Sequence, residues 1–210
     1  MLDTVKDFAQ KHFKTARGSH NWDHTLRVYR LCERIGMAEG VDMNVLLSAA
    51  YLHDIGRSQQ DESSGAVCHA EIGALMAESM VKKLTLSEAQ KINILHCIRS
   101  HRFRGRFVPN TPEARVLFDA DKLDAIGAVG VARAFMFAGE VGARLHSAEV
   151  NIEDTAAYST DDTGYREFIV KLSKIKDRIL TEEGHRLARY RHDIMVEFFK
   201  QFLEEYEGRR

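Results

Sequence analysis

Hydrophobic residues recur along most of the chain with the spacing of helix faces. Val28, Leu31 and Ile35 are separated by three and four residues, which places them on one side of an α-helix. No stretch alternates convincingly between apolar and polar residues, as a half-buried strand does. We therefore expect helices from residue 2 to a break at Gly18 and at about residues 21–38, 43–53, 69–84, 87–100, 112–137, 165–180 and 182–206.

Polar stretches separate these helices. Residues 57–68 and 102–111 are predicted to be loops, and residues 139–164 an irregular excursion with at most a short helix. Because strands do not alternate with helices, the predicted fold class is all-α. We expect one domain over residues 1–210, with a functional core at about 20–125 and a C-terminal helical hairpin at about 165–207.

Composition limits the function classes. A chain of 210 residues with 44% hydrophobic residues can build one substantial core. Its 30 Lys+Arg residues nearly balance 31 Asp+Glu, so no global charge draws it to nucleic acid or an anionic membrane. Three cysteines without a C-x-x-C pair, and an N-terminus with no apolar signal segment, indicate a soluble, cytoplasmic protein. Oligomeric state is left open, although packing within the chain is favoured for the C-terminal phenylalanines.

Histidine is enriched, with 10 residues, and several lie on the apolar faces of the expected helices. His24 precedes Val28 by four residues, and the pair His53–Asp54 ends an apolar helix. A lone inward histidine is more often a hydrogen-bonded core residue than a ligand, and His96 is interpreted in that way. His12, His146, His185 and His192 are expected to have surface or structural roles. The inward set is His24, His53, Asp54, His69, His101 and Asp121.

Burying these ionisable groups separately in a helical core would be costly. If they converge, one divalent cation satisfies all of them together. Imidazole and carboxylate without thiolate suit a borderline or hard metal such as Mn, Fe, Co, Ni or Zn. The spacing therefore predicts a metal site built from several helices.

Three motifs add a family resemblance. They are S-H-N-W-D-H-T-L-R-V at residues 19–28, L-H-D-I-G at 52–56 and D-A-D-K-L-D at 119–124. Together they resemble the HD superfamily of metal-dependent phosphohydrolases, and most closely its small single-domain bacterial and archaeal members. The resemblance continues through R-L-A-R-Y-R-H at residues 186–192, so it covers nearly the whole chain. It implies an all-α HD-domain bundle.

The resemblance also implies roles for individual residues. The family's four metal ligands match His24, His53, Asp54 and Asp121, and Mg joins the metals left open. His69 and His101 match histidines that bind a second metal or the substrate phosphate in other branches. The G-Y-P signature of cyclic-di-GMP phosphodiesterases is missing, which argues against that branch.

The implied activity is hydrolysis of a phosphate ester or anhydride, with a nucleotide as the leading substrate. A nucleotidase and a nucleoside triphosphate pyrophosphohydrolase both fit. Asp54, His69 and His101 are the catalytic candidates, and the substrate-binding candidates are His20, Lys122, Arg102 and Arg104. Two alternatives are kept: a di-iron oxygenase of the same superfamily, and a non-catalytic metal-dependent nucleotide sensor.

Overall fold

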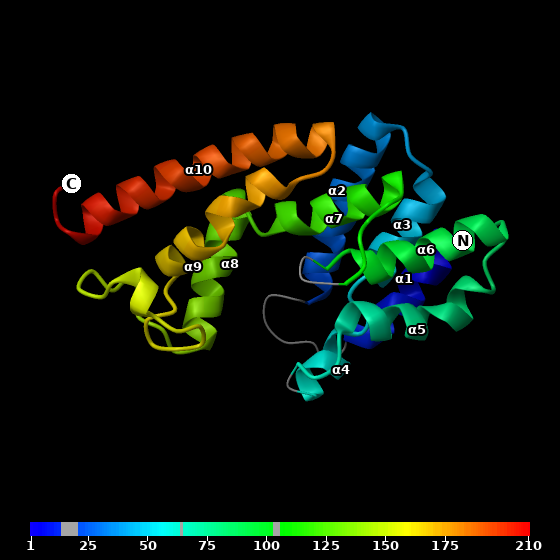
Figure 1. Ribbon diagram of the computed structural model, residues 1–210, viewed down its shortest axis with the longest axis horizontal. Helices are drawn as coiled ribbons and strands as arrows, with labels where there is room; N and C mark the ends of the chain where they lie inside the picture. Colours follow the sequence, from blue (N-terminus) through cyan, green and yellow to red (C-terminus); the bar gives the residue numbers. More distant parts are fainter. Residues whose placement is uncertain (14–20, 64, 103–105) are drawn as a thin grey trace. The chain divides into compact units, whose positions relative to one another are not determined.

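The computed structural model describes residues 1–13, 21–63, 65–102 and 106–210, and within these ranges it contains helices and no strand. The predicted all-α class is confirmed (Figure 1). None of the described helices is both long and apolar enough to cross a membrane. The elements are α1 (Leu2–Gln10), η1 (Lys11–Phe13), α2 (Trp22–Glu39), α3 (Met43–Leu52), α4 (Arg57–Glu62), α5 (His69–Val81), α6 (Glu88–Ser100), α7 (Pro112–Asp124), α8 (Gly127–Glu140), η3 (Ile152–Asp154), α9 (Gly164–Val170), η4 (Leu172–Arg178) and α10 (Glu182–Tyr206).

The chain forms two compact units. The first comprises Met1–Asp121 with Leu180–Gly184, and the second comprises Lys122–Ile179 with His185–Arg210. The expectation of one domain with a core at about residues 20–125 and a C-terminal extension stays a prediction. All the described metal-ligand candidates belong to the first unit.

Helix α3 is the centre of the first unit. It packs against α1, α2, α5 and α6, and every residue from Val45 to Leu52 is buried. A helix that is buried on all sides needs apolar or small residues all round, which this segment supplies. Its N-terminus is capped by the Asp42 carboxylate, which accepts hydrogen bonds from the Asn44 and Val45 N–H groups at 2.9 and 3.2 Å. Its other end delivers His53 and Asp54 into the interior.

Capping groups define the ends of α2 and the start of α6. Asn21 caps α2 by accepting from the His24 N–H at 3.2 Å, and Gly40 ends that helix in the left-handed region at φ 67°. Ser87 and Gln90 form a capping box at the start of α6. The α2 cap fixes the first turn of the helix that carries His24.

The prediction of a loop over residues 57–68 was wrong at its start, where α4 (Arg57–Glu62) forms. None of its residues is buried, so it has no apolar face for a periodicity argument to detect. Side-chain contacts hold it instead: Arg57 pairs with Asp54 and the Gln60 amide accepts from the His69 N–H. Polar contacts within the first unit stabilise this short helix.

The single helix predicted over residues 112–137 is two helices, α7 and α8. Gly127 adopts φ +81°, which an L side chain rarely does. At Gly130 a Cβ would lie 2.3 Å from the Ala125 carbonyl oxygen, so only glycine permits the close approach of that carbonyl. The hydrophobic periodicity continues through the break, which is why the pattern did not reveal it.

The first arm of the predicted C-terminal hairpin is also divided. It consists of α9 and the 3-10 helix η4, separated at Lys171, which has φ −135° and ψ −58°. The second arm, α10, has the predicted bounds. In the second unit, Phe168 of α9 stacks on Phe199 of α10 with ring centroids 4.6 Å apart.

A buried carboxylate attaches residues 180–184 to the first unit. Asp119 of α7 accepts hydrogen bonds from the Leu180 N–H at 2.9 Å and from the Thr181 N–H and hydroxyl at 2.8 and 2.6 Å. Asp119 is fully buried. Charge-assisted hydrogen bonds of this kind are stronger than neutral ones, and losing their acceptor leaves buried donors unsatisfied.

Replacement of this carboxylate should therefore destabilise the fold. We expect Asp119→Ala to lower the free energy of unfolding by about 2–4 kcal/mol, measured by urea denaturation. The matched control is Asp193→Asn on an exposed position of α10, for which we expect a change within about 0.5 kcal/mol. Equal midpoints for the two variants would contradict a structural role for Asp119.

Candidate metal centre

The structure brings the predicted inward residues of the first unit together. They come from α2, the C-terminal end of α3, the start of α5, the end of α6 and α7. Five of the six residues have exposed fractions of 0–4%, while the Asp121 side chain is 20% exposed. The complete set is His24, His53, Asp54, His69, His101 and Asp121.

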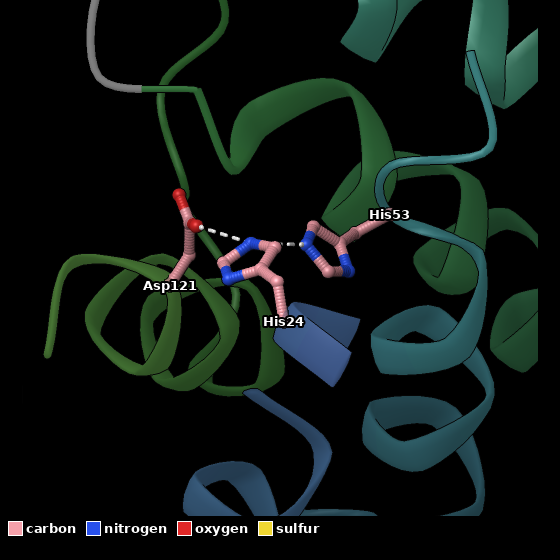
Figure 2. A group of neighbouring side chains, drawn as sticks. All are labelled: His24, His53 and Asp121. Carbon is pink, nitrogen blue, oxygen red and sulfur yellow. Dashed lines mark hydrogen bonds and ion pairs between the residues drawn. The ribbon is translucent and has the colours of Figure 1, made fainter. Parts of the chain in front are cut away.

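One group consists of His24, His53 and Asp121 (Figure 2). The Nε2 atoms of His24 and His53 are 3.5 Å apart, and His24 Nε2 is 3.3 Å from Asp121 Oδ1. Each residue thus directs one potential ligand atom toward the other two. These are three of the four positions that the family resemblance assigns to metal ligation.

A second group consists of Asp54, His69 and His101. The Nε2 atoms of the two histidines are 3.2 Å apart. They lie 3.4 Å (His69) and 3.6 Å (His101) from Asp54 Oδ1. The two histidines predicted as catalytic candidates are therefore direct neighbours of the Asp54 carboxylate.

Asp54 connects the two groups through its two oxygens. Oδ1 faces His69 and His101, whereas Oδ2 is 3.7 Å from His24 Nε2 and 3.8 Å from His53 Nε2. A single carboxylate thus offers one oxygen to each group. This arrangement provides donors for one cation or, through a shared carboxylate, for two.

Hydrogen bonds set the tautomers of three histidines. His53 Nδ1 lies 2.8 Å from the Ala50 carbonyl oxygen, and His101 Nδ1 lies 2.7 Å from that of Ile98. His69 Nδ1 lies 2.8 Å from Gln60 Oε1, which also accepts from the His69 backbone N–H. Since these oxygens only accept, each Nδ1 carries a proton, and the neutral form of each ring has its lone pair on Nε2.

These lone pairs converge on one another and on carboxylate oxygens, so the site requires positive charge. Protonation is an unfavourable source. Burial lowers the pKa of His53 to about 4, with a further decrease from His101 and His24 that Asp54 opposes. Burial likewise lowers the pKa of His69 to about 2. A divalent metal ion fits the donor set, because it takes neutral imidazole and carboxylate ligands together.

The H-D-I-G turn fixes the distance between Asp54 and α5. A Cβ on Gly56 would lie 2.4 Å from the His69 carbonyl oxygen and 2.7 Å from the Gly73 nitrogen. Only glycine therefore allows the turn to approach the first turn of α5 this closely. The approach places the Asp54 carboxylate beside the His69 ring.

Two residues at this site were not recognised in the sequence. Gln60 orients His69, and the Arg57 guanidinium contacts both Asp54 and His69. Both lie in the segment that was predicted to be a loop. Only their positions in the sequence could have indicated a role at the site: Arg57 directly follows the H-D-I-G motif, and Gln60 lies three residues further on.

The structure describes two of the four predicted substrate-binding residues. Arg102 donates to Cys68 Sγ at 3.3 Å, next to His69 in sequence. Lys122 follows Asp121 directly in α7. His20 and Arg104 lie outside the described residues. The roles assigned to all four stay predictions.

Other histidines have contacts away from this site. His96 Nε2 accepts from the Asn110 N–H at 3.3 Å. In the second unit, the ring of His146 packs edge-on against Tyr165, Phe202 and Tyr206. These two histidines thus form hydrogen-bonding and packing contacts within the fold.

Comparisons with known proteins agree on a family. The model of the HD domain matches residues 21–126. The chain is 30% identical over 213 residues to the uncharacterized protein YpgQ of Bacillus subtilis, covering 98% of this chain and 94% of YpgQ. Over 121 residues it is 31% identical to ribonuclease Y of Chloroflexus aurantiacus, a match that spans 58% of this chain and 21% of that protein.

Solved structures give the same result over the full length. The structure of Bacillus subtilis YpgQ in complex with ADP has a TM-score of 0.77 and 27% identity, covering 99% of each chain. A structure described as an HD-superfamily hydrolase from Bacillus thuringiensis has a TM-score of 0.77 and 25% identity, covering 99% of this chain and 97% of that one. Fold and metal-ligand motifs therefore point to one family.

The lowered histidine pKa values predict how the metal-free protein responds to pH. The unfolded-state value is 6.5, and the folded-state pKa is about 4 for His53 and about 2 for His69. Between these values the unfolded chain binds more protons than the folded one. Stability is therefore fully present above pH 6.5 and is lost as the pH falls, by at most about 1.4 kcal/mol per pH unit for each histidine.

The measurement is urea denaturation of chelator-treated protein between pH 7.5 and pH 5. We expect the unfolding free energy to fall across this range, and to fall less steeply in His53→Gln, which removes one of the two titrating rings. A pH-independent midpoint in the unsubstituted protein would contradict burial of neutral rings at this site.

Proposed function

The chain belongs to the HD-domain family and is a metal-dependent hydrolase, and from this premise we propose that it hydrolyses a phosphate ester or anhydride of a nucleotide. The observation that carries the proposal is the convergence of six residues with nitrogen or oxygen donor atoms, Asp54 among them. Such a donor set holds a divalent ion of the kind that phosphoryl transfer requires.

We assign His24, His53, Asp54 and Asp121 as the ligands of the metal ion. When bound, a divalent cation polarises a phosphoryl oxygen and lowers the pKa of a nearby water molecule. The carbonyl oxygen of Ala50 holds the His53 ring with Nε2 toward the site. Burial of this ring and of His24 limits access of bulk water to the donor atoms.

His69 and His101 flank Asp54 Oδ1, and we propose that they act on the reacting phosphate. A neutral ring with a lone pair on Nε2 can take a proton, and a protonated one can deliver it to a leaving oxygen. Arg102, Lys122, His20 and Arg104 are proposed to contact the phosphate oxygens. Guanidinium and ammonium groups stabilise the negative charge that remains on those oxygens.

The nucleotide assignment is supported by the relative that was solved with ADP. Bacillus subtilis YpgQ matches 99% of this chain, and its ligand contains both a purine nucleoside and a phosphoanhydride. We therefore propose nucleoside di- and triphosphates as the first substrates to test. Release of pyrophosphate would identify a pyrophosphohydrolase, and release of inorganic phosphate would identify a phosphatase.

A second candidate is favoured by one observation. Because Asp54 offers one oxygen to each group of histidines, the site also suits two irons and oxygen-dependent chemistry. Iron content near two per chain and oxygen consumption would support that function. The non-catalytic sensor would bind nucleotide with metal and release no product.

The ligand assignment and the activity are tested together. We expect the His53→Ala/Asp54→Ala variant to lose bound metal and to lose at least about 1000-fold in nucleotide hydrolysis, since the cation and its general acid–base partners act as a unit. The measurements are metal analysis of purified protein and product release from a nucleotide panel with Mn²⁺. Far-UV circular dichroism checks that the variant is folded.

The matched control is His192→Ala on α10, in the second unit, which should keep both metal and activity. Stoichiometric metal in the double variant would contradict the ligand assignment. An unsubstituted protein that is fully loaded with metal and inert toward the whole panel would contradict the hydrolase proposal and favour the sensor.

A further inference from the structure

The Arg57 guanidinium lies among the donor atoms of the second group. Its Nη2 atom is 3.1 Å from Asp54 Oδ1, 3.3 Å from Asp54 Oδ2 and 3.3 Å from His69 Nε2. Since Gln60 holds the proton on His69 Nδ1, the His69 Nε2 lone pair faces Arg57 as an acceptor. One cationic nitrogen therefore contacts two of the three residues that form this group.

We propose that Arg57 serves as the resident cation of the Asp54–His69–His101 group, so that the protein binds one divalent ion tightly and admits a second only by displacing this guanidinium. The inference rests on the proposed metal-dependent function and specifies the stoichiometry of its site. The donor atoms that Arg57 contacts are those that a second ion would need. Two positive charges against the same carboxylate oxygen repel each other at short range.

The location of Arg57 allows its guanidinium to occupy the place of a second metal ion. The residue is the first of α4, and its backbone N–H donates to the Asp54 carbonyl oxygen at 3.0 Å. The guanidinium is therefore tethered within a few residues of the carboxylate that it neutralises. An arginine side chain stays charged at every relevant pH, so this positive charge is permanent.

The same location also allows displacement. The Arg57 side chain is 16% exposed, so it has a route to solvent. Its Nε is buried and has no hydrogen-bond partner among the described residues. An unsatisfied buried donor costs free energy. The ion pair with Asp54 and the hydrogen bond to His69 therefore hold the guanidinium here, and a competing divalent cation weakens those contacts.

Manganese binding to the metal-free protein tests this inference. Equilibrium dialysis with elemental analysis gives the number and affinity of sites, and low-temperature EPR detects two Mn²⁺ ions that share a carboxylate through their exchange-coupled spectrum. We expect one tight site in the unsubstituted protein and a second at least about tenfold weaker, because the second ion must displace Arg57. In Arg57→Ala we expect two sites within about tenfold of each other and a coupled spectrum.

Two further variants separate charge from local structure. Arg57→Lys keeps a cation on a flexible stem and should keep the second site weak. Arg106→Ala removes an exposed arginine of the first unit that pairs with Glu71, and should bind manganese as the unsubstituted protein does. Circular dichroism of each variant verifies the fold, and the unsubstituted and Arg57→Lys measurements test the inference without the alanine variant.

Two equally tight sites in the unsubstituted protein would overturn the inference while leaving the metal-dependent function in place. A folded Arg57→Ala variant that still binds only one ion would do the same. Absence of any tight manganese site in the unsubstituted protein would instead overturn the proposed metal centre, and with it this role of Arg57.

Discussion

The arrangement of the metal centre in the first unit depends on the contacts between the buried Asp54 carboxylate and the surrounding histidines. This carboxylate lies at the end of α3, the helix that is buried on all sides, and faces four histidine nitrogens at 3.4–3.8 Å. A buried carboxylate among neutral imidazole rings is costly unless a cation accompanies it. The fold supplies one such charge from Arg57 and a donor set that suits a metal ion. The same need for positive charge beside Asp54 therefore governs both the stability of this buried site and its capacity to bind a metal ion.

Hydrogen bonds and close backbone packing restrict the orientation of the histidine and aspartate side chains at this site. The carbonyl oxygens of Ala50 and Ile98 each receive a ring N–H from the histidine three residues later. The backbone of α3 and α6 thereby sets the tautomer of its own terminal histidine. Gly56 brings the Asp54 turn against α5, and the short polar helix α4 contributes Gln60 and Arg57. Metal ligands held by such contacts are preorganised for binding.

The sequence predicted the parts of this site that follow helical spacing. His24 and His101 share a helix face with buried apolar residues, and His53–Asp54 ends an apolar segment. Arg57 and Gln60 act through contacts across space, and α4 has no apolar face, so periodicity could not place them. The break between α7 and α8 depends on the backbone angle of Gly127 and the space beside Gly130. The division of six donors into two groups sharing Asp54 is likewise a property of three-dimensional packing.

Anomalous X-ray scattering from crystals of the protein loaded with Mn²⁺ tests directly whether a metal ion binds beside Asp54. We expect a strong anomalous peak within coordination distance of the Nε2 atoms of His24 and His53 and of carboxylate oxygens of Asp54 and Asp121. A fully loaded crystal whose manganese lies away from Asp54 would contradict this assignment.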